Sequence, residues 1–446
     1  MFKFLRDGAE QPLDLEWPTG AEKVRQAISE AMSARNIAFL LGAGCSSLKK
    51  DGAEVGIATM GLLAKEFCAE TLAARAKGFY GSLSAAAAAG EEGTSLEAVD
   101  LPSAPESDDP PPAPWRLTRE EVDCLDKIGV DLEQYNTNLE RLAEVLFSQR
   151  FVYRHSANAS HWAQRDAVEG VIAKLQSYLL SRISDGPFSK GDTTVRDLYE
   201  RFYKKLVLRD RSLPRPWVFT TNYDLFNETA MDRLGIPYAN GFSGVVERRF
   251  HPASFRYALA EQFDIGARKW AAVDAFVYLC KLHGSVSWTE DEHGLFPIRE
   301  AWPQQDAGRI LIYPTPAKQN ASLASPYADL FREFQSRVVQ EQCVLVTVGY
   351  AFGDEHVNNI IYQALTIPTF RLIVFAALDT AGDIAKLKAL RDPRIWFIGG
   401  DGPEGGSRAH YFDTIVEHFM PQRPSDRVDD AVRRVLQEMA PPPREE

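Results

Sequence analysis

The feature that most constrains the fold is a set of short apolar runs that each end in glycine or small polar residues. The runs Ile37–Leu41, Val277–Leu279 and Val344–Val348 have the composition of buried strands, and Trp217–Phe219 is a shorter run of the same kind. The motifs after them are, in chain order, Gly42-Ala43-Gly44-Cys45-Ser46, Thr220-Thr221-Asn222-Tyr223-Asp224, Lys281-Leu282-His283-Gly284-Ser285 and Gly349-Tyr350-Ala351-Phe352-Gly353-Asp354. Because open parallel sheets bind ligands at the carboxyl ends of their strands, these motifs predict one shared site.

Helical patterns alternate with the strands. The alternation predicts an α/β fold, with a Rossmann-like parallel sheet, helices on both faces and a mainly helical insertion. Residues 21–35 and 61–77 carry apolar side chains at helical spacing, and further strands are expected at Arg371–Phe375 and Ile395–Ile398. We divide the chain into an N-terminal helix with the first part of the core (1–81), an acidic Ala/Pro-rich mobile insertion (82–115), a helical insertion (116–212), the remainder of the core (213–420) and a C-terminal amphipathic helix with its tail (421–446).

The two insertions differ in composition. Between Lys77 and Arg116 there is no basic residue, and Ala85–Ala89 is an alanine run, so this stretch has little apolar surface to offset the entropy lost on ordering. In the second insertion, Thr118–Glu121 can cap one helix, and Ala167–Ile183 predicts another. A further helix is predicted by the apolar stripe Leu139, Leu142, Ala143, Leu146 and Phe147.

Composition and charge narrow the function classes. The formal net charge of −12 disfavours direct nucleic-acid binding, which usually needs a basic surface. No run reaches the roughly 18 apolar residues of a membrane span, and the charged start at Met1–Asp7 does not fit a signal peptide. The five cysteines are scattered without a C-x-x-C pair, which favours a reducing cytoplasm and argues against a disulfide framework or a structural zinc site.

The glycines of Gly42-Ala43-Gly44 permit a tight turn and a close approach of the backbone to a pyrophosphate. Amides at the start of the next helix can neutralise the phosphate charge, and Ser46 adds a hydroxyl donor. An ordinary strand-to-helix turn also uses small residues, so this motif alone leaves both interpretations open. Its spacing departs from G-x-G-x-x-G, and no acidic residue clearly ends a second strand about 20 residues later, which disfavours a hydride-transferring dehydrogenase.

The polar residues after the strands also have two interpretations each. His283 can act as a general base near neutral pH, or it can be a packing histidine. Asn222 can satisfy backbone groups in a turn, and Asp224 can cap a helix. Asp354 and His356 lie close together in the sequence but have no further ligands at metal-binding spacing, so no metal is expected there.

Taken together, the four motifs resemble those of the sirtuin family, specifically its bacterial NAD-consuming branch. Sirtuins carry a Gly-Ala-Gly-x-Ser loop, a Thr-Gln-Asn-x-Asp segment and a His-Gly strand end, which here are Gly42–Ser46, Thr220–Asp224 with Thr221 in place of Gln, and His283-Gly284. Gly349–Asp354, with His356 and Asn358, is similar to the Gly-Tyr-Ser-Phe-x-Asp-x-His-x-Asn signature of the bacterial branch. The resemblance covers about residues 21–80 and 130–420.

The resemblance implies a Rossmann-like domain that takes NAD as its substrate and needs no metal. Asn222 would engage the nicotinamide ribose and the attacking water, His283 would be the catalytic base, and Asp224 would help to place the nicotinamide. The implied NAD-binding residues are Gly42, Ala43, Gly44, Cys45 and Ser46 at the phosphates, Thr221 and Asp224, and Gly349, Tyr350 and Phe352 in the last loop, where the first two would line the adenine-ribose side.

Two departures from the deacetylating sirtuins bear on the reaction. Those enzymes carry a zinc ribbon of paired cysteines soon after the His-Gly-Ser strand, whereas Val286–His293 contains no cysteine, which puts protein deacetylation in doubt. Their flexible Gly-Ile-Pro-x-Phe-Arg loop is represented only by Gly56–Met60, without the Phe and the Arg.

We therefore expect an NAD glycohydrolase that releases nicotinamide and ADP-ribose. By resemblance to sirtuin-like subunits of anti-phage systems, it would deplete NAD as a defence effector. Its control would come from homo-oligomer assembly or from a partner, a HerA-type ATPase in the first place and a short Argonaute protein in the second. Two alternatives stay open: an NAD-dependent deacylase or ADP-ribosyltransferase, and a non-catalytic module that binds NAD or ADP-ribose.

Overall fold

The computed structural model describes residues 1–50, 53–69, 115–158, 160–184, 192–210, 212–264, 269–290, 298–302, 310–312, 326–379 and 382–422. The acidic insertion expected at 82–115, apart from Trp115, lies outside the described residues. The same holds for the C-terminal helix expected within 421–446.

A nine-stranded sheet forms the centre of the molecule, in the order β2-β1-β18-β17-β16-β3-β6-β12-β7. Its strands are β1 (Phe2–Leu5), β2 (Leu13–Leu15), β3 (Asn36–Leu41), β6 (Trp217–Thr220), β7 (Tyr238–Ala239), β12 (Val277–Lys281), β16 (Cys343–Val348), β17 (Arg371–Phe375) and β18 (Ile395–Gly400). The strands from β18 to β7 are parallel, while β1 and β2 extend the edge in antiparallel fashion. The expected parallel α/β sheet is confirmed, and the antiparallel edge is an addition that the sequence patterns did not predict.

Helices cover both faces of this sheet, which is why its strands are apolar on both sides. Alternate residues of β3 show the division: Phe39 belongs to one buried cluster and Leu40 to the other. The first cluster packs under α1 (Thr19–Met32), α6 (Thr194–Leu206), α7 (Phe226–Leu234), α12 (Phe412–Thr414) and η5 (Ile415–Phe419). The second packs under α9 (Tyr327–Val338), α10 (Glu355–Ala364) and α11 (Asp383–Ala389).

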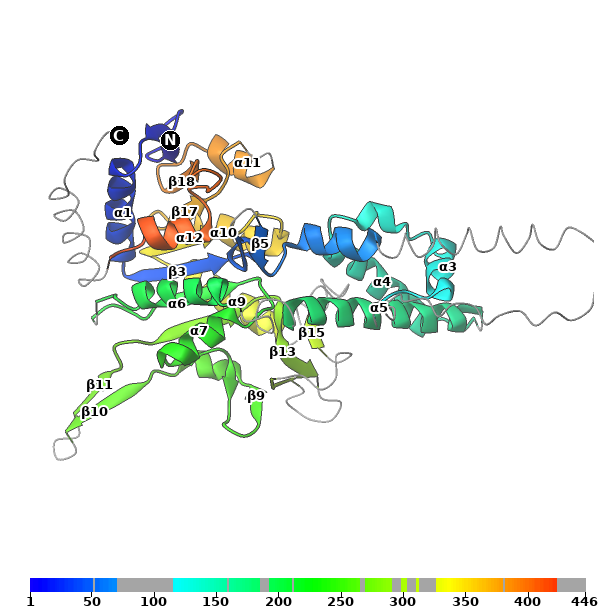
Figure 1. Cartoon of the computed structure of the whole chain (residues 1–446). Helices are drawn as coiled ribbons and strands as arrows, with labels where there is room; N and C mark the ends of the chain where they lie inside the picture. Colours follow the sequence, from blue (N-terminus) through cyan, green and yellow to red (C-terminus); the bar gives the residue numbers. More distant parts are fainter. Residues whose placement is uncertain are drawn as a thin grey trace, which may run out of the picture.

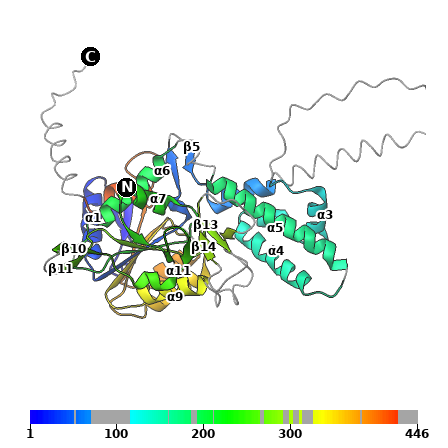
Figure 2. The same cartoon turned by 90° about the horizontal axis from the view of Figure 1, so that it is seen from below.

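Three helices of the expected helical insertion form a separate module beside the sheet. They are α3 (Arg119–Lys127), α4 (Leu139–Arg154) and α5 (Ser160–Ser184), with η2 (Leu132–Tyr135) between the first two. Figures 1 and 2 both show them extending away from the strands. The predicted capping box of Thr118 and Glu121 is present at α3, and the predicted apolar stripe of α4 is buried. In contrast to this module, α6 packs on the sheet, where Phe202 contacts Phe39.

Smaller antiparallel sheets, which the sequence patterns did not predict, accompany the central sheet. The largest has the order β15-β13-β14-β9-β8, with β8 (Phe242–Ser243), β9 (Arg248–Phe250), β13 (Gly284–Glu290), β14 (Ile298–Glu300) and β15 (Ile310–Ile312). The others pair β4 (Ser47–Lys50) with β5 (Ala53–Gly56) and β10 (Ala260–Asp264) with β11 (Lys269–Ala272). Short helical turns occur at η1 (Ala43–Cys45) and η3 (Pro252–Arg256). In the described part of the chain, no helix is both long and apolar enough to cross a membrane.

Candidate functional site

Four strand ends meet at the point where the order of the sheet reverses. From β3 the chain passes to the neighbouring β6 and on to β12, and it then returns to β16 on the other side of β3. The crevice at such a switch point is the usual ligand site of an open α/β sheet. A cavity of about 350 Å³ lies there, within the range of small-molecule sites. The motifs after all four strands contribute to its lining.

Three glycines bring the ends of β3 and β16 into backbone contact. The Gly42 amide donates to Val348 O (2.9 Å), and the Gly44 amide donates to Gly349 O (3.0 Å). A Cβ on Gly42 would lie 2.4 Å from Gly349 O, and one on Gly349, which has a φ of +61°, would lie 2.7 Å from Cys45 N. The packing of the two loops therefore requires glycine at these positions, in addition to any role in approaching a ligand.

The Gly42–Ser46 turn does not lead directly into a helix, which agrees with the helical pattern expected only from residue 61. The turn forms only the short η1, which is followed by the β4–β5 hairpin, and helical structure resumes at residues 60–69. The amides of Gly44, Cys45 and Ser46 donate to Gly349 O, Gly42 O and Ala43 O. These donors are used to close the turn and are not directed at a phosphate in the manner of a helix N-terminus.

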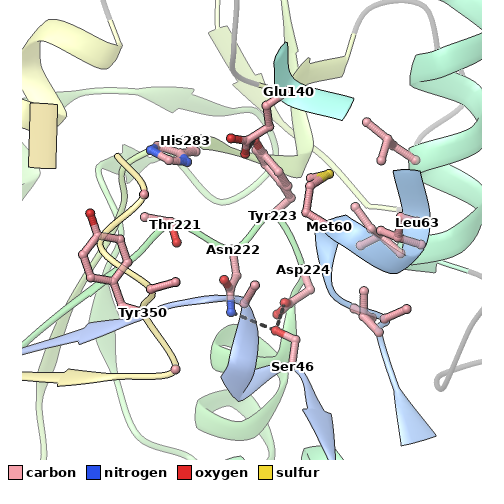
Figure 3. Close-up of a pocket in the computed structure, with 18 of the residues that line it drawn as sticks. Ser46, Met60, Leu63, Glu140, Thr221, Asn222, Tyr223, Asp224, His283 and Tyr350 are labelled. Atoms are coloured by element: carbon pink, nitrogen blue, oxygen red, sulfur yellow. Dashed lines mark hydrogen bonds between the residues drawn. The ribbon is translucent and has the colours of Figure 1, made fainter. Parts of the chain in front are cut away.

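A chain of short hydrogen bonds joins the first two motifs. Asn222 Nδ2 donates to Gly42 O (2.9 Å) and to Ser46 Oγ (2.8 Å). Ser46 Oγ in turn donates to Asp224 Oδ2 (2.5 Å). All three side chains are buried and line the cavity, together with Thr221 and Ala43 (Figure 3). Asp224 Oδ1 also accepts from the Phe226 amide at the start of α7 (3.1 Å), but the N-cap of α7 is Leu225, so Asp224 does not have the capping role that its sequence position allowed.

His283 lies in the same cavity and is held by a carboxylate. Its Nε2 is 2.8 Å from Asp354 Oδ2, and the histidine is buried. Asp354 is fixed in turn, because its Oδ1 accepts from the amides of His356 and Val357 at the start of α10. An ionised Asp354 stabilises the tautomer with the hydrogen on Nε2, so the lone pair lies on Nδ1. This pairing favours the general-base interpretation of His283 over simple packing.

The buried side chain of Lys281 supports the site through hydrogen bonds to its neighbours. Its buried ammonium group donates to the carbonyl oxygens of Tyr223 (3.3 Å) and Asp224, to Glu228 Oε1 (3.1 Å) and to Ser285 Oγ (3.0 Å). Burial raises the pKa of Glu228, and the Lys281 ammonium group opposes that rise. The lysine thus fixes the backbone that carries Tyr223 and Asp224.

Residues of the last motif, Gly349–Asp354, lie partly in the cavity lining and partly in the hydrophobic core. Gly349 and Tyr350 line the cavity, and Tyr350 Oη donates to Asn358 Oδ1 (2.9 Å). Burial, and then the charge of Asp354, raise the pKa of Tyr350. Phe352 does not line the cavity, because it packs in the hydrophobic cluster beneath α9, α10 and α11.

Cys45 is likewise buried behind the cavity. It is completely inaccessible, its thiol contacts Val348 O (3.3 Å), and burial followed by the charge of Asp224 raises its pKa well above the ordinary range. Gly42, which is buried, and Gly44, which is exposed, are also not among the residues that line the cavity. Of the predicted NAD-binding residues, these three and Phe352 therefore support the site without lining it.

The opposite wall contains residues that the sequence patterns did not assign to the site. Ile57, Ala58, Met60 and Leu63 precede and begin the helical segment 60–69, while Thr137, Asn138, Glu140, Leu179 and Ile183 come from the helical module. Tyr223 Oη contacts Glu140 Oε1 (3.2 Å), which joins the module to the sheet. Ile57 and Met60 lie within Gly56–Met60, the stretch that was compared with the flexible loop of sirtuins on sequence alone, and that comparison was the available signal for them. Glu140 carried no comparable signal.

The fold and the cavity define the class of this protein: it is a Rossmann-like α/β protein with a ligand pocket at its topological switch point. The sequence profile of the SIR2-like domain matches residues 216–370, which contain Asn222, His283 and Asp354. This match supports a sirtuin-like family and an NAD-related, sirtuin-type function for the chain. Among curated proteins, no significant match to the chain is found. Within the described ranges, no three His, Cys, Asp or Glu side chains gather as a metal site.

Proposed function

We propose that this protein is an NAD glycohydrolase that cleaves the bond between nicotinamide and ribose. The observation that carries the proposal is the convergence of Asn222 and the His283–Asp354 pair on one cavity at the switch point of the sheet. These are the groups that a hydrolytic reaction needs, namely a polar side chain to hold the ribose and the water, and a base whose orientation is fixed.

The charges of the cavity fit the cationic end of the substrate. Its described lining residues include Glu140, Asp224 and Asp354 but no Lys or Arg. The nicotinamide ring of NAD is positively charged until the glycosidic bond breaks, so these carboxylates favour its binding in this part of the cavity.

The reaction then needs no general acid. As the bond between C1′ and the ring nitrogen breaks, the electron pair stays on the nitrogen and neutral nicotinamide leaves, while positive charge develops on the ribose. The oxygen of a water molecule adds to C1′, and His283 Nδ1 accepts the proton that this water loses. Asn222 orients the water and the ribose hydroxyls, while Asp354 stabilises the protonated imidazole. The products are nicotinamide and ADP-ribose.

Uncontrolled NAD hydrolysis would harm the cell that contains the enzyme, so the proposal includes control. We infer an anti-phage defence role in the cytoplasm, in which NAD depletion follows assembly into a homo-oligomer or contact with a partner. A HerA-type ATPase is the first candidate partner and a short Argonaute protein the second. The support for this role is the similarity of Gly349–Asn358 to the bacterial sirtuin-like signature.

Chromatography of NAD incubated with the purified chain tests the activity, with and without the product of a neighbouring gene. Equimolar nicotinamide and ADP-ribose are expected from the native chain, and His283→Ala should abolish turnover while NAD still binds in calorimetry. Nicotinamide release that depends on an added acceptor would establish a transferase instead. Binding of NAD that remains intact in every reaction would establish a non-catalytic binding module.

A further inference from the structure

The three carboxylates of the cavity differ in how fully their oxygens are used. Asp224 accepts from Ser46 on one oxygen and from the Phe226 amide on the other. Asp354 contacts His283 through one oxygen and accepts two amide hydrogens on the other. Glu140 is different, because its Oε1 contacts Tyr223 Oη and its Oε2 has no hydrogen-bond partner in the part of the chain that the structure describes.

The position of Glu140 favours a charged and well-placed side chain. It lies in the first turn of α4, where the helix dipole stabilises an anion, and Asn138 Oδ1 caps the same helix by accepting from the Arg141 amide (3.1 Å). The contact with Tyr223 Oη orients the carboxylate toward the sheet. Figure 3 shows Glu140 beside Tyr223 and His283, across the cavity from Ser46. Tyr223, which contacts Glu140, also lies next to the proposed base, with 6.4 Å between its ring centroid and that of His283.

The chemistry of the proposed reaction gives this carboxylate a use. When the bond to nicotinamide breaks, positive charge develops on the ribose, and a fixed anion that touches this group stabilises the transition state. We propose that Glu140 is a catalytic residue whose carboxylate stabilises the developing ribosyl cation through Oε2. No proton or electron pair moves to or from it. The helical module, which lies outside the SIR2-like match at 216–370, thereby supplies one catalytic group.

This assignment rests on the proposed NAD hydrolysis, so its test has one readout in turnover and another in binding. Glu140→Gln keeps the shape and removes the charge, whereas Glu140→Asp keeps the charge and shortens the side chain. The matched control is Glu144→Gln, one turn further along α4 and absent from the cavity lining. Turnover of NAD by the full chain is measured for each variant, together with any partner that the activity requires. Binding of NAD and of NADH, whose ring is neutral, is measured by calorimetry in a His283→Ala background.

Glu140→Gln should lower kcat by about 100-fold while KM for NAD rises by no more than about fivefold, and Glu140→Asp should retain more activity than Glu140→Gln. The preference for NAD over NADH should fall about fivefold in Glu140→Gln and stay unchanged in Glu144→Gln. A packing role predicts the opposite order, with the isosteric Gln the better substitute, and that order overturns the proposal. Equal kcat values and equal NAD/NADH ratios for the two Gln variants also overturn it. A native chain that never hydrolyses NAD refutes the proposed function, while the binding ratio still decides whether Glu140 faces the cationic ring.

Discussion

The two walls of the cavity are built in different ways. The sheet wall comprises the strand-end residues Gly42–Ser46, Thr221–Asp224, His283 and Gly349–Asp354, whose backbone and side chains are joined by short hydrogen bonds. The helical wall comprises Ile57, Ala58, Met60 and Leu63 with the lining residues Thr137, Asn138, Glu140, Leu179 and Ile183, and it is mainly apolar apart from Thr137, Asn138 and Glu140. A wall fixed by hydrogen bonds can hold reacting groups in place, whereas an apolar wall excludes water and shapes the cavity. Substitutions on the sheet wall should therefore affect folding and turnover, as should those of Glu140, whereas substitutions at the apolar positions of the helical wall should affect substrate affinity.

The largest effect is expected where the two loops of the sheet wall touch. In Gly42→Ala, the new Cβ would lie 2.4 Å from the carbonyl oxygen of Gly349, which cannot move without disturbing β16. We expect a loss of about 3 kcal/mol in the free energy of unfolding, measured by urea denaturation. The control is Gly353→Ala, because a Cβ at Gly353 meets nothing within 4 Å. Equal stabilities for the two variants would show that the sheet wall is less rigid than its contacts indicate.

The next prediction concerns Asn222 on the same wall and distinguishes a loss of turnover from a loss of stability. Asn222→Ala removes the donor to Gly42 O and Ser46 Oγ and the group proposed to orient the water. NAD turnover should fall by about 100-fold or more, measured as nicotinamide release. Asn240→Ala is the control, since Asn240 is also buried and hydrogen-bonded, to Glu300, but lies outside the cavity lining. Similar losses of activity in both variants would indicate that Asn222 acts only through stability.

The sheet wall is also the region that the sequence predicts best. The runs that form β3, β12, β16 and β6 are apolar because both faces of the sheet are covered, so their composition identifies them without any knowledge of partners. The residues after them converge because parallel strands end at the same edge. Lining by Ser46, Asn222, Asp224 and His283 follows from this geometry.

The remaining features depend on contacts that local patterns do not contain. The strands of the β15-β13-β14-β9-β8 sheet are short, and they pair across long stretches of chain. Phe352 faces the core because of the loop conformation after β16, where its φ is +56°. Glu140 lies in the cavity because α4 docks beside Tyr223. Neither a motif nor a period in the sequence specifies such a docking.

On the helical wall, a smaller effect on affinity is expected. Met60 lines the cavity and is partly buried, so Met60→Ala removes apolar surface from the substrate side without opening the core. The KM for NAD should rise about fivefold while kcat changes less than about twofold. Leu62→Ala is the control, because Leu62 lies in the same helical segment but is 48% exposed and absent from the lining. A fall in kcat with unchanged KM in Met60→Ala would assign part of the chemistry to the apolar residues of this wall as well.

The smallest expected effect is a difference in reactivity between two cysteines. It compares how readily the sheet wall and the helical module open. Cys45 of the sheet wall is completely buried, and its raised pKa leaves almost no thiolate at pH 8, the species that reacts with iodoacetamide. Cys124 of α3 is 6% exposed, and burial raises its pKa while the nearby Lys127 lowers it. In the folded protein at pH 8, peptide mapping by mass spectrometry should find Cys124 alkylated well before Cys45, and both fully alkylated in urea. Because the hydrogen bonds of the sheet wall must break to expose Cys45, its modification should follow global unfolding, whereas local opening of the helical module suffices for Cys124. Alkylation of Cys45 at the rate of Cys124 would mean that the sheet wall and the helical module open together, and the distinction between a rigid sheet wall and a more readily opened helical module would fail.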